Sequence, residues 1–305
     1  VQICMKKIYN IGFFGDDVWA HKALEYLLKD KSININFVCG RFKTKDKILK
    51  KIAEKYKIKF FKKKNINDIK FINYIKKNKI DLLASMSFDQ IFKNEIINAI
   101  NNNIINCHAG KLPFYRGRNI LNWALINGEK DFGITTHFVN KKIDTGDIIL
   151  QKIFKISKND DYKSLLIKSH NECAKIIFKT IKKIQNNDYK ATPQNKFSKK
   201  SSYFKKRVMG DEIINLKQKS YHIKNFVRAL VEPGPIARIN LKNNQICVKK
   251  ISILNKKNVI HKINNNLLTV KNKKIYLKTT DKKIICIEKW HLKRKTNKNF
   301  KLEIL

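Results

Sequence analysis

Apolar side chains in the first part of the chain alternate between strand-like and helix-like spacing. Residues 6–14 form a β-like run, and residues 18–28 then repeat apolar side chains at the spacing of a helix. The same order returns further along, so strands and helices follow one another as they do around a parallel sheet. The later members are a strand at 33–38, a helix at 45–56, a strand at 58–61, a helix at 67–75 and a buried strand at 80–84.

Carboxylates stand where two of these helices begin. Asp16 and Asp17 precede the first helix, and Asn67 and Asp68 precede the third. Side chains of this kind accept hydrogen bonds from the first free N–H groups of a helix. The pattern predicts an α/β fold, with an open, Rossmann-like, mostly parallel sheet and helices on both of its faces.

The second half of the chain changes character. An apolar stripe over 160–185 predicts a long helix, and the segment 186–202 is rich in Asn, Lys and Ser, which is typical of linkers. One helix and several short β-like runs follow, which predict a smaller β-rich C-terminal domain with barrel-like strand spacing. We expect a first domain over 1–190, a linker over 191–202 and the β-rich domain over 203–305. The helix covers 220–230, and the runs cover 237–241, 246–254, 267–270, 274–277 and 284–287.

The chain is strongly basic, because 67 Lys and Arg against 24 Asp and Glu give a formal net charge of +43. Such an excess is typical of proteins that bind nucleic acid or anionic membranes. Only seven of the 67 are Arg, however, although Arg is the better bidentate ligand for phosphate. Lys, Asn and Ile are raised along the whole length, which favours a compositional bias over a nucleic-acid surface.

The cysteines are scattered and lack the paired spacing of a zinc site, so we expect reduced, buried thiols and no metal. No N-terminal segment reads as a secretory signal, and no apolar run approaches the ~18 residues of a membrane span. These features predict a cytoplasmic protein without a membrane partner. The cysteines are Cys4, Cys39, Cys107, Cys173, Cys247 and Cys286.

The segment 85–92 directly follows the fourth predicted strand. Open α/β sheets bind their ligands just beyond the carboxyl ends of the strands. Ser85, Ser87 and Gln90 are therefore candidates for ligand contact. An equally good alternative is that the segment is the polar start of a helix, capped by Ser87 or Asp89.

The stretch 104–147 gathers most of the polar side chains that could perform chemistry. Asn106 and His108 lie two residues apart on a predicted strand, so both side chains point to one face of the sheet, and Asp144 follows in a Gly-containing loop. An amide can stabilise an oxyanion, an imidazole can transfer a proton and a carboxylate can orient the imidazole, which suits acyl transfer to an amine. Taken singly, each residue also fits a structural role. His137 in a second strand reads as a packed or partly exposed side chain, and its nearness in sequence to these residues leaves a minor role open.

Three motifs carry a resemblance to a known family. The run from Asn106 to Pro113 reads NCHAGKLP, Tyr115 opens the run YRGR, and Ile143 opens the run IDTGD. Together they resemble the signature of the folate-dependent formyltransferases, which include glycinamide ribonucleotide, methionyl-tRNA and sugar-nucleotide N-formyltransferases. The resemblance implies 10-formyltetrahydrofolate as the formyl donor, a primary amine as the acceptor and no metal.

The catalytic positions of that family match three residues of this chain. The resemblance implies that His108 is the acid/base residue and that Asn106 holds the formyl oxygen as negative charge develops on it. Asp144 would position His108 and help to remove the proton of the amine. The resemblance also implies a folate-binding surface, which by matching positions comprises Gln90, Ile91, Phe92, Arg118, Asn140, Lys141, Lys142 and Ile143.

A finer resemblance concerns the acceptor. The run from Arg116 to Ala124 is most similar to the sugar-nucleotide members. It implies formylation of a nucleotide-linked amino sugar, a 4-amino-4,6-dideoxyhexose, for cell-surface polysaccharide biosynthesis. The alternative is formylation of methionyl-tRNA, which the charge and the C-terminal domain favour. A non-enzymatic nucleic-acid-binding protein on the same fold is a second alternative, and a homodimer stays open.

Overall fold

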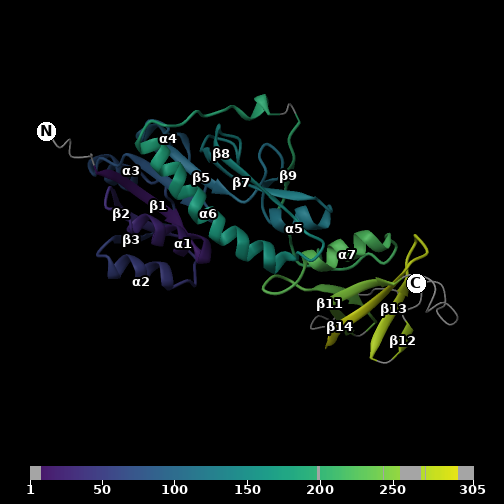
Figure 1. Cartoon of the computed structure of the whole chain (residues 1–305). Coiled ribbons are helices and arrows are strands. Elements are labelled where there is room, and N and C mark those ends of the chain that lie inside the picture. The colour runs from purple at the N-terminus through teal and green to yellow at the C-terminus, as the bar shows by residue number, and fades with distance from the viewer. Residues whose placement is uncertain (1–7, 198–199, 243, 255–268, 272, 295–305) are drawn as a thin grey trace. The chain divides into compact units, whose positions relative to one another are not determined.

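The structure is a computed structural model, and the chain separates into two compact units (Figure 1). The first unit comprises Val1–Gly117, Phe132–Phe154 and Ile167–Phe204. The second unit comprises Arg118–Asp131, Lys155–Leu166 and Lys205–Leu305. The domain limits expected at residues 190 and 203 stay predictions. The structure describes residues 8–197, 200–242, 244–254, 269–271 and 273–294.

A seven-stranded sheet organises the first unit. Its strands are β1 (Tyr9–Gly15), β2 (Ile33–Gly40), β3 (Lys59–Lys62), β4 (Leu82–Met86), β5 (Ile104–His108), β7 (Asp131–Phe138) and β8 (Ile148–Lys155). They lie in the order β3-β2-β1-β4-β5-β7-β8. The strands from β3 to β5 pair in parallel, whereas β7 runs antiparallel to β5. The predicted α/β fold with a mostly parallel sheet is confirmed.

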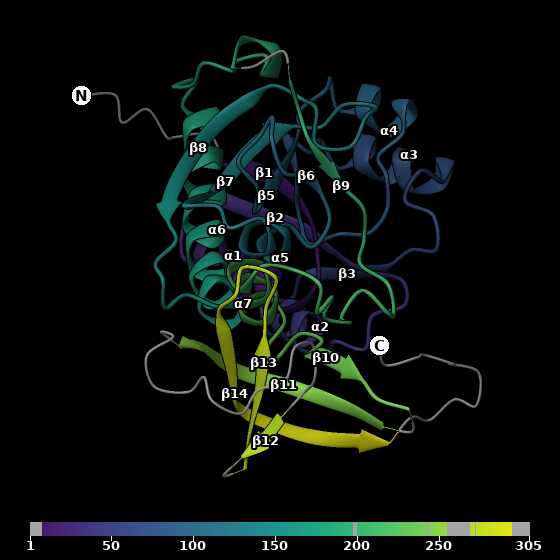
Figure 2. The same ribbon diagram turned by 90° about the vertical axis from the view of Figure 1, so that its right-hand side faces the viewer.

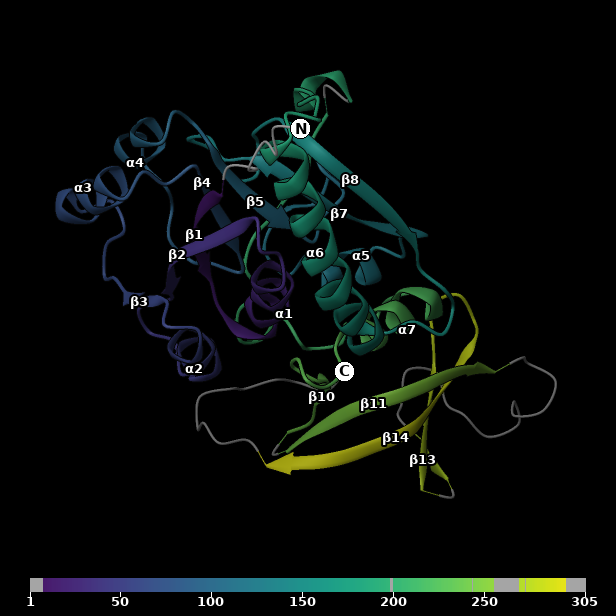
Figure 3. The same ribbon diagram turned by 60° about the vertical axis from the view of Figure 1, so that its left-hand side comes forward.

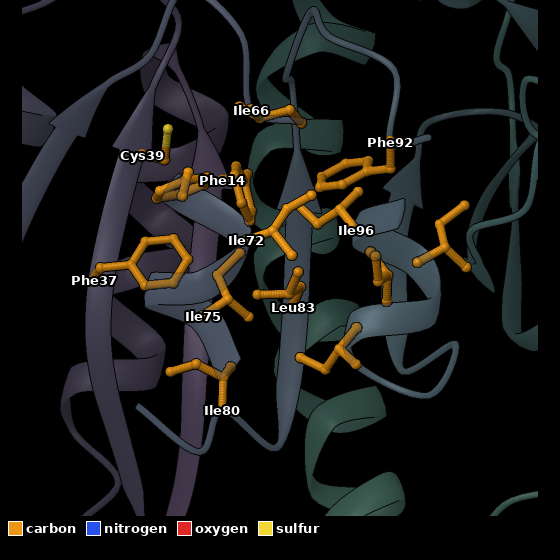
Figure 4. Close-up of a cluster of buried hydrophobic side chains, with 14 residues drawn as sticks. Phe14, Phe37, Cys39, Ile66, Ile72, Ile75, Ile80, Leu83, Phe92 and Ile96 are labelled. Atoms are coloured by element: carbon orange, nitrogen blue, oxygen red, sulfur yellow. The ribbon is translucent and has the colours of Figure 1, made fainter. Parts of the chain in front are cut away.

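One face of this sheet carries a buried hydrophobic cluster that two helices cover. The helices of the first unit are α1 (Asp17–Leu28), α2 (Ile48–Lys55), α3 (Ile69–Lys77), α4 (Asn94–Ala99) and most of α6 (Tyr162–Gln185). Phe14 of β1 packs edge-to-face on Phe37 of β2, with 5.5 Å between the ring centroids. Both belong to a buried cluster with Leu83 of β4, Ile72 of α3 and Ile96 of α4 (Figure 4). Helices α3 and α4 therefore pack against the centre of the sheet.

Helices α1 and α6 lie side by side on the opposite face (Figure 3). The Trp19 ring of α1 meets the His170 ring of α6 edge-on, with 4.4 Å between the centroids. The Cys107 thiol of β5 points to this side and donates to the Cys173 carbonyl oxygen of α6 at 3.7 Å. Since side chains alternate along a strand, Asn106 points to the other face, as predicted.

The two predicted helix caps differ in outcome. The Asp68 carboxylate accepts hydrogen bonds from the Lys70 and Phe71 N–H groups, so this cap is confirmed. Asp16 occupies the N-cap position of α1 but makes no capping hydrogen bond. Its carboxylate instead accepts a hydrogen bond from the Thr44 hydroxyl at 2.6 Å. The prediction was wrong at Asp16 because a partner distant in sequence binds the side chain that would otherwise cap the helix.

The segment that follows β4 does not begin a helix at Ser87 or Asp89. Helix α4 begins at Asn94, after the N-cap residue Lys93. Ser87 has a left-handed backbone, with φ of 55°, and its hydroxyl accepts a hydrogen bond from Arg41 Nη2 at 2.8 Å. The helix-start alternative is therefore wrong, and the segment is a loop at the carboxyl end of β4.

The second unit combines two helices with an antiparallel sheet. Its elements are α5 (Ile120–Ile126), α7 (Ser220–Ala229), β10 (Ala237–Asn240), β11 (Asn244–Leu254), β12 (Thr269–Lys271), β13 (Lys274–Lys278) and β14 (Ile284–Arg294). The strands lie in the order β10-β11-β14-β13-β12 (Figure 2), which confirms a β-rich C-terminal part. Within the described ranges this sheet is open rather than closed into a barrel. Residues 267–268 of one expected run lie outside the described residues.

The remaining expectations concern cysteines, membranes and metals. Cys39, Cys107, Cys173, Cys247 and Cys286 are buried free thiols, as predicted, and Cys4 lies outside the described residues. In the part of the chain that the structure describes, no helix has the length and apolar character needed to cross a membrane. The described His, Cys, Asp and Glu side chains form no group of three or more that could hold a metal ion.

Candidate active site

An amide and two imidazoles share one face of the sheet. The antiparallel register of β5 and β7 places Asn106 opposite His137, and directly opposed residues project to the same side. Asn106 Nδ2 lies 3.4 Å from His137 Nε2. His108 follows two residues along β5, so its side chain projects to this face as well.

Asp144 lies between the two imidazoles. Its Oδ2 atom is 3.6 Å from His108 Nδ1, and its Oδ1 atom is 3.5 Å from His137 Nε2. The Gly117 N–H donates a hydrogen bond to Oδ2 at 2.9 Å. The φ angle of Asp144 is 53°, a left-handed conformation that is uncommon for residues other than glycine. The structure thus brings together Asn106, His108 and Asp144, with His137 beside them.

The Asp144 carboxyl is held in its charged form. Its side chain is only 10% exposed, and burial by itself would raise the pKa of the group. The adjacent His108 and His137 and the Gly117 N–H outweigh burial and hold the pKa of Asp144 well below its ordinary range. Asp144 therefore offers a negative charge to whichever imidazole carries an additional proton.

Backbone carbonyls set the tautomer of both imidazoles. His108 Nε2 lies 2.7 Å from the Tyr115 carbonyl oxygen, and His137 Nδ1 lies 2.7 Å from the Phe138 carbonyl oxygen. A carbonyl oxygen only accepts, so each ring donates its N–H there, and we assign the tautomers on this basis. The ring nitrogen that faces Asp144 is therefore the one that carries no proton in the neutral imidazole.

The loop that supplies the Tyr115 carbonyl depends on a glycine and on an uncommon backbone conformation. A Cβ atom on Gly110 would lie 2.3 Å from His108 Nε2 and 2.4 Å from the Tyr115 carbonyl oxygen. Tyr115 has φ of 58°, and its N–H donates to Ser202 Oγ at 2.9 Å. Its ring stacks on Phe204 with 4.8 Å between the centroids. These contacts hold the Tyr115 carbonyl where it meets His108.

A buried glutamine joins the Asp144 loop to Arg116. Gln194 lies in the 3-10 turn η1 (Gln194–Lys196) and is 4% exposed. Its Nε2 atom donates to the carbonyl oxygens of Asp144 and Gly146 at 2.9 and 2.8 Å. Its Oε1 atom accepts from Arg116 Nε and Nη2 at 3.2 and 2.7 Å. Gln194 thereby connects the loop that carries the carboxylate to the loop that follows Tyr115.

The predicted folate contacts after β4 have different environments. The Gln90 amide donates to the Lys63 carbonyl oxygen at 2.8 Å and accepts from the Ile66 N–H at 3.0 Å. Phe92 is 5% exposed and belongs to the hydrophobic cluster, whereas Ile91 is 57% exposed. Ile91 thus presents its side chain to solvent, while Gln90 and Phe92 shape the loop. Their contact with folate stays a prediction.

The other predicted folate contacts lie on exposed chain. The loop 140–143 leads directly into Asp144, and all four of its side chains are exposed. Asn140 Oδ1 accepts from the Thr145 hydroxyl at 2.7 Å, which closes the loop on itself. Arg118 is also exposed and belongs to the second unit. The roles of these residues stay predictions.

No sequence motif singles out two residues of this site, His137 and Gln194. His137 reads as a packed or partly exposed strand residue with a minor role left open, and the structure buries it against Asn106 and Asp144. Only the register of β5 against β7 reveals this, and no local motif marks it. Gln194 lies in a segment whose composition is typical of a linker. Such a composition predicts an exposed side chain, whereas Gln194 is buried.

Comparisons of the sequence point to one family. The sequence model of the formyl transferase family matches residues 19–181, and that of the formyl transferase C-terminal domain matches residues 209–301. The bifunctional polymyxin resistance protein ArnA of Wigglesworthia glossinidia brevipalpis is 38% identical over 205 residues, which are 67% of this chain but only 31% of ArnA. The methionyl-tRNA formyltransferase of Clostridium tetani is 31% identical over 255 residues, 81% of either chain.

Solved structures extend the similarity to nearly the whole chain. WlaRD, a sugar 3N-formyltransferase solved with dTDP and 5-N-formyltetrahydrofolate, is 26% identical, with a TM-score of 0.70 over 95% of this chain and 99% of WlaRD. An N-formyltransferase from Helicobacter canadensis, solved with folinic acid and dTDP-3-aminofucose, has a TM-score of 0.68 over 92% of this chain and 98% of its own. At 24% identity, the second shows a shared fold.

Proposed function

The chain belongs to the formyl transferase family, and we propose that it transfers the formyl group of 10-formyltetrahydrofolate to the amino group of a nucleotide-linked amino sugar. The observation that carries the proposal is the grouping of Asn106, His108 and Asp144 around one point of the sheet face. An oxyanion donor, a proton carrier and a fixed negative charge are the parts that acyl transfer to an amine requires.

Asn106 is the group we expect to bind the formyl oxygen. The Asn106 amide nitrogen carries two N–H donors. It lies 3.4 Å from His137 Nε2, so one of the two N–H groups points to that ring. The second N–H can meet the formyl oxygen as negative charge develops on it. A single donor of this kind is typically worth about 2.7–4 kcal/mol of transition-state stabilisation.

His108 and Asp144 handle the proton. His108 Nε2 donates to the Tyr115 carbonyl, so Nδ1 is the atom that takes up the proton of the amine as its nitrogen bonds to the formyl carbon. The bond from that carbon to N10 of the folate would break, and the proton held at His108 would pass to the departing N10. Asp144 lies 3.6 Å from Nδ1 and stabilises the resulting imidazolium. His137 and the Gly117 N–H also favour the charged carboxylate, so Asp144 faces the imidazolium with a negative charge.

The exposed loop before Asp144 suits a folate. When bound, 10-formyltetrahydrofolate supplies an activated formyl group. Ile143 is 47% exposed and Ile91 is 57% exposed, and such side chains can cover the apolar rings of a folate. Lys141 and Lys142 are exposed beside Ile143 and can pair with the carboxylates of its glutamyl part.

A sugar acceptor is supported by two observations. The run from Arg116 to Ala124 resembles the sugar-nucleotide members, and WlaRD, a sugar 3N-formyltransferase, aligns with 95% of this chain at 26% identity. We propose a 4-amino-4,6-dideoxyhexose as the sugar, whereas WlaRD is a sugar 3N-formyltransferase. The position of the amino group on the sugar is therefore the most detailed claim of the proposal, and the experiment must test it directly.

The deciding experiment is a panel of acceptors with 10-formyltetrahydrofolate as the common donor. dTDP- and UDP-linked 3-amino and 4-amino dideoxyhexoses are compared with methionyl initiator tRNA, and products are identified by the added formyl mass. We expect formylation of an amino sugar, with the 4-amino series preferred. Formylation of methionyl-tRNA alone would refute the sugar assignment and leave formyl transfer standing, whereas no transfer to any acceptor would refute both.

Methionyl-tRNA is the second candidate acceptor. It is favoured by the net charge of +43 and by relatives such as the Clostridium tetani enzyme, which aligns with 81% of this chain. Salt separates the two acceptors, because each phosphate contact adds to the salt dependence of binding. For a sugar nucleotide, kcat/KM falls only modestly between about 50 and 200 mM salt, whereas several tRNA phosphate contacts would lower it by orders of magnitude.

A further inference from the structure

We propose that Gln194 is a positioning residue, which sets the Asp144 carboxylate against His108 by joining the Asp144 loop to Arg116. The proposal rests on the proposed formyl transfer, since it assigns Gln194 to the same reaction. Gln194 is 4% exposed and lies 50 residues beyond Asp144 in the chain, so its contact with the loop is a product of the fold.

The hydrogen-bond pattern at Gln194 can be met only by an amide. On one side are two carbonyl oxygens, of Asp144 and Gly146, which only accept. On the other side is the Arg116 guanidinium, which only donates. The Gln194 amide supplies two donors to the first side and an acceptor to the second. A carboxylate would face the carbonyls with lone pairs, and an apolar side chain would leave both sides unpaired.

The chain that follows Gln194 also positions the N–H group that donates to the Asp144 carboxylate. Strand β9 (Tyr203–Phe204) pairs in parallel with β6 (Arg116–Gly117). The Ser202 carbonyl oxygen accepts from the Arg116 N–H at 3.0 Å, and the Gly117 N–H then reaches Asp144 Oδ2 at 2.9 Å. Gln194 therefore fixes the backbone of the Asp144 loop, and the chain that follows it fixes the donor that meets the carboxylate.

Gln185 provides a matched control in the first unit. Its amide also joins a backbone carbonyl to a cation, because Nε2 donates to the Ser32 carbonyl oxygen at 3.1 Å and Oε1 accepts from Lys182 Nζ at 2.7 Å. Gln185 is half-buried, and its hydrogen-bond partners Ser32 and Lys182 lie outside the Asp144 loop and β6. Gln185→Leu thus removes the same kind of interaction at a place remote from the proposed chemistry.

Kinetics of variants of the whole 305-residue chain form the first test. Gln194→Leu removes all four contacts, and Gln194→Glu keeps the volume and the Arg116 contacts while removing the two donors. Misplacement of a catalytic group by about 1 Å can cost about a hundredfold, so we expect kcat to fall tenfold or more in both variants, with the acceptor KM nearly unchanged. Gln185→Leu should keep wild-type kcat. Equal kcat in the Gln194 and Gln185 variants would overturn the proposal.

The second test needs no activity, so it separates this inference from the proposed function. The dipeptide Arg-Gly occurs once in the sequence, at Arg116-Gly117, so ¹³C-carbonyl arginine with ¹⁵N-glycine labelling selects the Gly117 amide alone. Its signal reports the hydrogen bond to Asp144 Oδ2. We expect the signal to shift in folded Gln194→Glu and to stay in place in Gln185→Leu. An unmoved signal in Gln194→Glu would overturn the proposal, even if wild-type protein formylates no acceptor.

Discussion

Substitution of Gly110 by alanine tests whether the Tyr115 carbonyl holds His108 in a productive position. The added Cβ would lie 2.3 Å from His108 Nε2 and 2.4 Å from the Tyr115 carbonyl oxygen. Ordinary contacts with carbon begin at about 3.5 Å, so each of these atoms must retreat by roughly 1 Å. The 2.7 Å hydrogen bond between them cannot survive that displacement. We expect Gly110→Ala to lower kcat by about a hundredfold, the usual cost of a misplaced catalytic group.

Gly12→Ala is the control for overpacking without damage to the site. Its Cβ would lie 2.4 Å from Phe37 Cζ and 2.6 Å from Leu83 Cδ2, inside the hydrophobic cluster. Both variants should lose about 1–3 kcal/mol of folding free energy, which thermal unfolding measures. Initial rates at saturating substrates, scaled to the folded fraction, then isolate the catalytic effect. If the kcat of Gly110→Ala lies within about fivefold of Gly12→Ala, a difference of roughly 1 kcal/mol, the Tyr115 carbonyl does not position His108 for catalysis.

Three further predictions follow from individual side chains. Asn106→Ala and His108→Ala should each lower kcat at least about a hundredfold with the fold intact, and near-normal initial rates in either folded variant would remove that residue from the mechanism. Arg118→Ala should mainly raise a substrate KM, because a guanidinium suits carboxylate or phosphate, and a loss confined to kcat would contradict this role. In the second unit, Asp281 accepts hydrogen bonds from the Ser220 N–H and hydroxyl at 3.0 and 2.7 Å. Burial opposes its charge, but these bonds and that of a neighbouring hydroxyl lower the pKa of Asp281 to about 2. The stabilisation of the fold by the charged Asp281 is therefore complete above the ordinary carboxyl pKa of 3.8 and is lost as the pH falls toward about 2. Asp281→Ala should accordingly lower Tm most above pH 3.8. A difference in Tm that does not depend on pH would refute this account.

Local rules account for what the sequence alone revealed. Alternating apolar spacing predicted the strands and helices of the first unit, because periodicity reports which side of each element is buried. The two-residue spacing of Asn106 and His108 predicted a shared face, because alternation along a strand needs no tertiary information. The motif around Asp144 indicated the formyltransferase family, although no local pattern could show how near its carboxylate lies to either imidazole.

Tertiary structure decided the rest, because the contacts involved join segments far apart in the chain. The register of β5 against β7 places His137 opposite Asn106, and slipping that register by one residue would turn His137 to the other face. The path of the chain beyond α6 brings Gln194 to the Asp144 loop, although its sequence neighbourhood is polar and typical of a linker. Asp16 illustrates the same limit, since its carboxylate has the right position for a helix cap but binds Thr44 instead. Sequence patterns thus determined which residues could meet, and the pairing of distant segments determined which of them do.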